Sequence, residues 1–162
     1  SAVNRLMPDI GTEGSEWTTE FDRHSTANIV SDSNELVFRY RLSDLKSDSP
    51  YAAAVRSLDG LESRGVNVVS LIASADRPLR VSVQLRDANG SEDVRWMASF
   101  YADGTPRSIT IPFTRFKSTI PTEADTLQIE DIEAFLIVAD LVNSAPGTSG
   151  ELTLEGVQLE RR

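Results

Sequence analysis

The sequence predicts an all-β fold, an antiparallel sandwich or barrel, and three observations support this prediction. Short apolar runs recur at regular spacing, turn signals separate them, and no stretch sustains the period of about 3.6 residues that a helix requires. Roughly seven or eight short strands joined by turns are typical of these two architectures. We expect strands within residues 34–43, 50–60, 65–74, 79–87, 93–104, 107–116, 129–140 and 150–160.

The run at 79–87 has the clearest strand pattern. Up to position 86 its odd-numbered residues are apolar and its even-numbered residues are polar, which predicts one buried and one solvated face. The Asn-Gly pair at 89–90 then predicts a hairpin to the run at 93–104. In that return strand Trp96 has the register of the apolar positions, so we expect it in the core.

The remaining runs differ in how they would be covered. The run at 65–74 is almost wholly apolar, which is typical of a central strand covered on both sides. The run at 50–60 is a weaker strand that ends in Asp-Gly. Pro112 marks a sheet edge or the end of the strand at 107–116, because proline cannot donate to a ladder.

We expect one folded domain. A chain of 162 residues with 40% hydrophobic residues is long enough to bury a sizeable core. Residues 1–16 are turn-rich and aperiodic, which predicts an N-terminal lead-in to a single β-sandwich domain over residues 17–162. Trp17 lies at the start of that domain, and its side chain is expected either to cover a binding site as a lid or to pack into the core as a plug.

Composition excludes several classes of partner and chemistry. The net charge of −9 argues against nucleic acid and anionic lipid, because both require a basic surface. The absence of cysteine excludes disulfides, thiolate metal sites and cysteine nucleophiles. No run approaches the roughly 18 apolar residues of a membrane span. The chain opens without an initiator Met or a signal-peptide pattern, so we expect a piece of a longer protein.

Catalytic signals are weak, and the sequence predicts no enzyme. His24 is the one histidine, and its neighbours Asp22 and Ser25 do not make a triad, because a triad is defined by spatial geometry. We therefore expect His24 at the surface. Glycoside hydrolysis would need two acids about 5–10 Å apart across a cleft. The densest acidic stretch, at 123–133, has instead the composition of a loop and a solvated strand start.

The polar side of the run at 79–87 is the candidate binding surface. Its hairpin partner would add guanidinium groups, hydroxyls and an aromatic ring beside it. Such a mixture binds sugars, and arginine also pairs with carboxylates, which points to an acidic polysaccharide. A solvated face without a ligand would show the same pattern. The candidate ligand-binding residues are Arg80, Gln84, Arg86, Arg95, Tyr101 and Arg56, and Arg39 or Arg41 could join them.

From about residue 36 onward the order of features resembles a known group of domains. The matching segments are LVFRYRLS at 36–43, VNVVSLIAS at 66–74, SITIPFTRF at 108–116 and GELTLEGVQLE at 150–160. They resemble galactose-binding-like β-sandwich (jelly-roll) domains. This group includes several families of carbohydrate-binding modules and the related domain of complex I intermediate-associated protein. The resemblance spans roughly residues 17–160.

The resemblance implies a non-catalytic carbohydrate-binding module that is periplasmic or extracellular. Such a module would be either the sensing domain of a membrane receptor or an accessory part of a polysaccharide-degrading enzyme. A second class stays open, a protein-interaction or homodimerisation domain that binds no sugar. A concave face with an exposed Tyr101 would favour sugar, whereas a flat face buried in a symmetric dimer would favour assembly.

Two departures from the family pattern concern the signature tryptophan and a metal ligand. Residues 105–108 precede ITIPF and contain no tryptophan, and the acidic residue usual in the last strand is Glu155 rather than Asp. In the family this position often holds a structural calcium together with oxygens of the N-terminal segment. The resemblance therefore implies Glu155 as a candidate calcium ligand with Glu13, Glu16 or Glu20. No other cofactor is expected.

Overall fold

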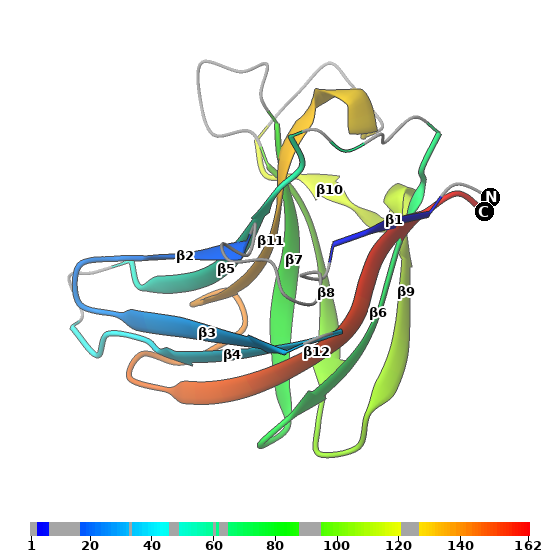
Figure 1. Ribbon diagram of the computed structural model, residues 1–162. Coiled ribbons are helices and arrows are strands. Elements are labelled where there is room, and N and C mark those ends of the chain that lie inside the picture. Colours follow the sequence, from blue (N-terminus) through cyan, green and yellow to red (C-terminus); the bar gives the residue numbers. More distant parts are fainter. Residues whose placement is uncertain are drawn as a thin grey trace.

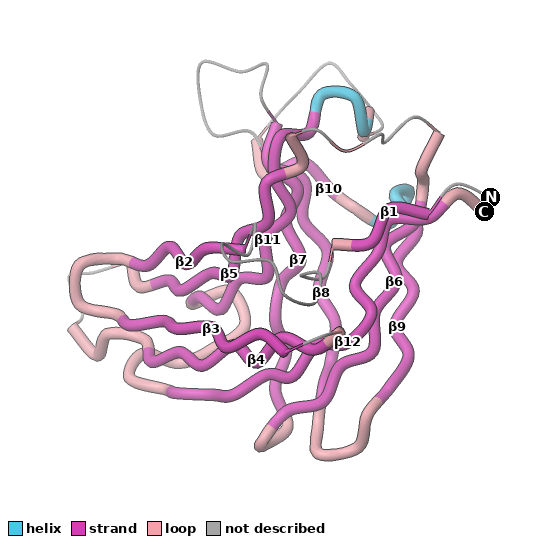
Figure 2. The backbone as a smooth tube through the Cα atoms, in the orientation of Figure 1, coloured by secondary structure: helices cyan, strands magenta, loops and turns pink. Residues whose placement is uncertain are grey.

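Two antiparallel sheets of six strands each form the computed structural model, which describes residues 3–6, 17–32, 34–45, 49–59, 61, 65–87, 95–120 and 127–162. Figure 1 shows the strands, and Figure 2 shows helix among the described residues as two short turns, Phe113–Arg115 and Ile129–Asp131. The antiparallel β-sandwich predicted from the sequence is confirmed. Within the described residues, no helix has the length and hydrophobicity required to cross a bilayer.

We call the two layers sheet A and sheet B. The strand order of sheet A is β3 (Thr26–Asp32), β4 (Glu35–Arg41), β12 (Ser149–Glu160), β6 (Val68–Ala75) and β9 (Arg107–Pro112), with β1 (Val3–Arg5) paired to β12. The strand order of sheet B is β10 (Lys117–Ser118), β8 (Arg95–Ala102), β7 (Leu79–Asp87), β11 (Ile132–Asp140), β5 (Tyr51–Ser57) and β2 (Trp17–Phe21).

All eight runs expected from the sequence contain a strand, and the strands that the sequence did not reveal lie at edges or are short. β3 is an edge strand in which only Ala27 and Ile29 pack against the core, so it lacks the alternation that identifies a strand. The turn expected at 89–90 lies outside the described residues.

The N-terminal segment takes part in the sandwich where it is described. Val3–Arg5 pair with the end of β12, and the fully buried Leu6 donates its N–H to the carbonyl of Val157 at 2.8 Å. The carbonyl of Leu6 in turn accepts a hydrogen bond from the indole nitrogen of Trp17. Leu6 therefore links the segment to both sheets.

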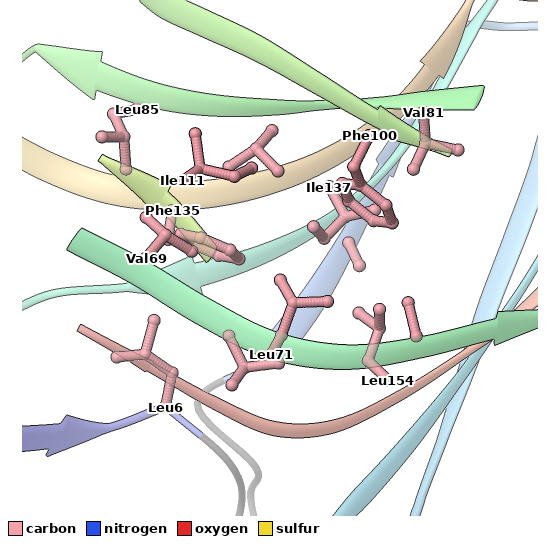
Figure 3. Close-up of a cluster of buried hydrophobic side chains, with 14 of the residues drawn as sticks. Leu6, Val69, Leu71, Val81, Leu85, Phe100, Ile111, Phe135, Ile137 and Leu154 are labelled. Atoms are coloured by element: carbon pink, nitrogen blue, oxygen red, sulfur yellow. The ribbon is translucent and has the colours of Figure 1, made fainter. Parts of the chain in front are cut away.

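The core fills the space between the sheets. Figure 3 shows Leu71 and Leu154 of sheet A facing Val81, Phe135 and Ile137 of sheet B. Burying a side chain of this size contributes about 1.5–3 kcal/mol, so this layer is the main source of stability.

Both tryptophans belong to this core. Trp17 is 3% exposed and meets Phe135 edge to face at 6.0 Å between ring centroids, so it plugs the core. Trp96 is likewise buried, as its register in the sequence predicts.

Strands β12 and β4 approach closely where Gly150 lies opposite Tyr40, and this contact can be tested by substitution. A Cβ added at Gly150 would lie 2.7 Å from the hydroxyl oxygen of the buried Tyr40 and 2.8 Å from its Cζ. A methyl group cannot fit there unless the ring moves. Replacing Gly150 with alanine is expected to lower the free energy of unfolding by about 1–3 kcal/mol, as overpacking does, measured by urea denaturation.

Gly104→Ala is the matched control, because its new Cβ would come no closer than 4.0 Å to the nearest group, the carbonyl of Ala75. Equal stability of the two variants would show that the contact with Tyr40 does not constrain position 150.

Candidate functional site

The outer face of sheet B carries the polar residues that the sequence assigned to one side of its hairpin. Val81, Val83 and Leu85 of β7 point into the core, so the alternate residues of this strand point outward. The register of β7 with β8 pairs Arg80 with Tyr101, Ser82 with Ser99, Gln84 with Met97 and Arg86 with Arg95. The predicted polar face is therefore confirmed on these two strands.

A cavity of about 400 Å³ hollows this face, and we call it the groove. It crosses five neighbouring strands, from Glu20 on β2 to Arg95 on β8. Four spacings between strands correspond to roughly 19 Å, so the groove is elongated. Its lining comprises Glu20, Ser49, Pro50, Tyr51, Ala53, Gln84, Arg95, Leu136, Val138, Asp140, Leu141 and Val142.

The floor of the groove is apolar. Ala53, Leu136 and Val138 belong to a small hydrophobic cluster, with Val55 and Ala134, that is separate from the main core. These residues alternate along β5 and β11 with the core-facing ones, which places them on the outer face. The side chains of Ala53, Leu136 and Val138 are themselves almost wholly buried, so the exposed apolar surface of the groove comes from Tyr51, Leu141 and Val142.

Gln84 and Arg95 form the polar side of the groove towards β8. The guanidinium of Arg95 donates through Nη1 to Oε1 of Gln84 at 3.2 Å, and the amide nitrogen of Gln84 lies 3.8 Å from the sulfur of Met97. Gln84 is buried in the groove wall, so its amide orientation is fixed. The pair presents pre-ordered polar groups to a ligand.

Asp140 lies at the end of β11 on the opposite side of the groove. Burial raises the pKa of this half-buried carboxyl, although the N–H of Val142, which donates to Oδ1 at 3.0 Å, opposes the shift. The following loop is tied back to β7 by Asn143, which donates to the hydroxyl of Ser82 at 2.9 Å. This rim is thus held against the sheet.

A second hollow, of about 290 Å³, lies beside the groove on the same face. Its lining comprises Thr18, Val55, Ser57, Asp59, Arg86, Glu133 and Ala134. Arg86 forms an ion pair with Glu20 of the groove, with Nη2 to Oε2 at 2.8 Å. The ion pair therefore connects the edges of the two hollows.

The structure separates the predicted ligand-binding residues into groups. Gln84 and Arg95 line the groove, and Arg86 lines the second hollow. Arg80 and Tyr101 share the face but lie at the other end of the β7–β8 pair, where Arg80 donates to the hydroxyl of Ser99 at 3.0 Å.

Arg56 does not join this face, and its expected place in the binding surface was wrong. It pairs with Trp17 and Phe135, whose side chains point into the core, so it lies on the inner side of sheet B and is only 7% exposed. Its Nε donates to the carbonyl of Leu6 at 3.2 Å. Arg39 and Arg41 belong to β4 in sheet A and cannot join the face either.

Tyr51 and Asp140 are groove residues that the sequence reasoning missed. Tyr51 is 37% exposed at the start of β5, in register with Asp140, and its N–H donates to Asp22 at 2.9 Å. The sequence did contain a signal for Tyr51, because residues 51, 53 and 55 share one face of a strand and the small Ala53 leaves room beside the ring. That signal was hidden because alanines occupy both faces of the strand.

The expected calcium ligands do not come together where the structure describes them. Glu155 follows the buried Leu154 in sheet A, whereas Glu20 is in sheet B and bound to Arg86. Glu13 and Glu16 lie outside the described residues. The described part of the chain holds no cluster of three metal-ligating side chains, and His24 is exposed. Calcium binding stays a prediction.

Comparisons with solved structures identify the fold. No family model matches the chain, and no curated protein does. Among solved structures, the family 11 carbohydrate-binding module of the cellulosomal cellulase Lic26A-Cel5E of Clostridium thermocellum has 21% identity and a TM-score of 0.72, covering 100% of this chain and 97% of that one.

Two further structures agree. A family 11 module from Clostridium thermocellum in complex with a β-1,3-1,4-mixed-linked tetrasaccharide has 20% identity and a TM-score of 0.69, covering 99% of this chain and 98% of that one. The agarase AgWH50C has 13% identity and a TM-score of 0.67, covering 100% of this chain and 25% of that one. The chain therefore has the jelly-roll β-sandwich fold found in these carbohydrate-binding modules, as its sequence resemblance implied.

Proposed function

We propose that this chain is a non-catalytic carbohydrate-binding module that holds a segment of a polysaccharide in the groove of sheet B. The observation that carries the proposal is the groove itself, an elongated cavity of about 400 Å³ on the free face of a sheet. Ligand sites of proteins are concave, mostly apolar and supplied with a few convergent polar groups. The groove has each of these properties.

The lining suits a sugar chain in particular. Tyr51, Leu141 and Val142, the exposed apolar residues of the lining, offer surfaces for the C–H faces of sugar rings. Gln84, Arg95 and Asp140 offer donors and acceptors for hydroxyl groups at the edges. A neighbouring fold in complex with a mixed-linked tetrasaccharide supports an extended oligosaccharide as the ligand.

The charge of one side of the face favours an acidic polysaccharide. Arg80, Arg95 and Lys117 lie on β7, β8 and β10, in a protein whose net charge is −9. Arg80 donates to the hydroxyl of Ser99, and Arg95 donates to the amide oxygen of Gln84. Guanidinium groups pair readily with the carboxylates of uronate sugars.

We place the module outside the cytoplasm, as part of a larger protein that degrades or senses polysaccharides. The match to an agarase, of which it covers 25%, supports the role of an accessory domain in an enzyme. The hollowed face favours sugar capture over a flat dimerisation surface. A glycan array with and without calcium, with the oligomeric state measured alongside, tests these assignments together.

The ring of Tyr51 yields the sharpest prediction. Tyr51→Ala is expected to weaken binding to the best glycan of the array about two- to tenfold, since a stacked ring is worth about 0.5–1.5 kcal/mol. Tyr101→Ala, which removes an equally exposed ring from the same face but away from the groove, should bind as the wild type does. Isothermal titration calorimetry measures both. A larger loss in Tyr101→Ala would move the site to the other end of β8.

Arg95 tests the acidic character of the ligand. Arg95→Ala should lower the affinity for an oligouronate at least about tenfold, because a charge-assisted hydrogen bond contributes about 1.5–3 kcal/mol. The loss should shrink at high salt. Arg39→Ala removes an exposed arginine from sheet A and should leave the affinity unchanged. A loss that is equal for neutral and acidic chains would contradict the charge argument.

Asp140 links binding to pH. Its raised pKa means that ionisation is harder in the folded protein than in the unfolded chain, so the carboxylate costs stability as the pH rises above the unfolded value of 3.8. Asp140→Asn should therefore be more stable than the wild type at about pH 7 and bind sugar more weakly, and the stability difference should vanish below about pH 3. Urea denaturation at both pH values checks this. A less stable variant at neutral pH would contradict it.

A further inference from the structure

One ion pair divides the outer face of sheet B into its two hollows. Nη1 and Nη2 of Arg86 donate to Oε1 and Oε2 of Glu20 at 3.2 and 2.8 Å. β7 and β2, which carry these residues, are separated by β11 and β5. The two side chains therefore meet over the intervening strands, on the face where the sugar chain is expected.

The geometry is that of arginine recognising a carboxylate. Two parallel N–H bonds from one guanidinium reach both oxygens of one carboxyl group, which is the arrangement arginine uses for carboxylate ligands. The side chains are 17% and 38% exposed, so the contact is partly shielded from water. A carboxylate of a bound uronate would make the same two bonds.

The surrounding charges decide the side from which a second carboxylate can approach. Asp59 and Glu133 line the second hollow beyond Arg86 and repel an anion there. On the groove side the cation of Arg95 attracts one, and the carboxyl group of Asp140 lies away from it at the opposite rim. A carboxylate of a chain in the groove would thus reach Arg86 from the side that Glu20 now occupies.

We propose, resting on the function proposed above, that Glu20 is an internal competitor for a ligand carboxylate. When a uronate chain binds, its carboxylate replaces that of Glu20 on Arg86, and Glu20 turns towards solvent. No covalent bond changes. A neutral chain has no anion to exchange, so it leaves the ion pair closed and occupies the groove alone. The pair therefore sets specificity by charge.

Glu20→Gln tests the exchange. Removing the competing charge should raise the affinity for an oligogalacturonate about tenfold, and the affinity for a cello-oligosaccharide of equal length should change less than about twofold. Glu151→Gln is the matched control. It removes one carboxylate from the Arg39–Glu151 ion pair of sheet A, which spans 2.6 Å, and should change neither affinity.

A second variant keeps the test independent of the first. Arg86→Gln should lower the oligogalacturonate affinity at least about tenfold and spare the neutral chain. Calorimetry of folded protein, checked by circular dichroism, measures each variant. Wild-type binding of the acidic chain without tightening in Glu20→Gln would overturn the exchange and leave the proposed function standing. Binding of neither chain by any variant would overturn both.

Discussion

Strand β11, one of the two central strands of sheet B, has apolar side chains on both faces, and both the core and the groove depend on it. Phe135 and Ile137 pack between the sheets, while Leu136 and Val138 form the floor of the groove. A strand covered in this way cannot move without exposing one of its two apolar faces. The groove floor is thereby fixed to the most stable part of the molecule.

The polar groups of the groove are held by their neighbours rather than by solvent. Arg95 orients Gln84, and the backbone of Val142 contacts Asp140. Burial raises the pKa of Asp140, so the ionisation of this carboxyl group opposes folding. Sites that bind ligands commonly retain such groups despite their cost in stability, because preformed polar groups need little ordering when the ligand arrives.

The sequence alone predicted the fold and the part of the outer face of sheet B that β7 and β8 form. Alternation has a period of two residues, so the outward positions of β7 and β8, including Gln84 and Arg95, followed from the local pattern. Tyr51 and Asp140 did not follow, because the neighbours of β7 are set by pairing between distant segments. Arg56 was misplaced for a local reason, since the alanines before it give no period from which to assign its face.

The central claim is that a sugar chain lies across β5, β11, β7 and β8 in the groove. The most direct measurement is a titration of ¹⁵N-labelled protein with an oligouronate, followed by amide chemical shifts. The account predicts that the largest shifts cluster at Tyr51, Gln84, Arg95 and Asp140. Shifts that cluster on the outer face of sheet A, or an unchanged spectrum with acidic and neutral chains alike, would contradict it.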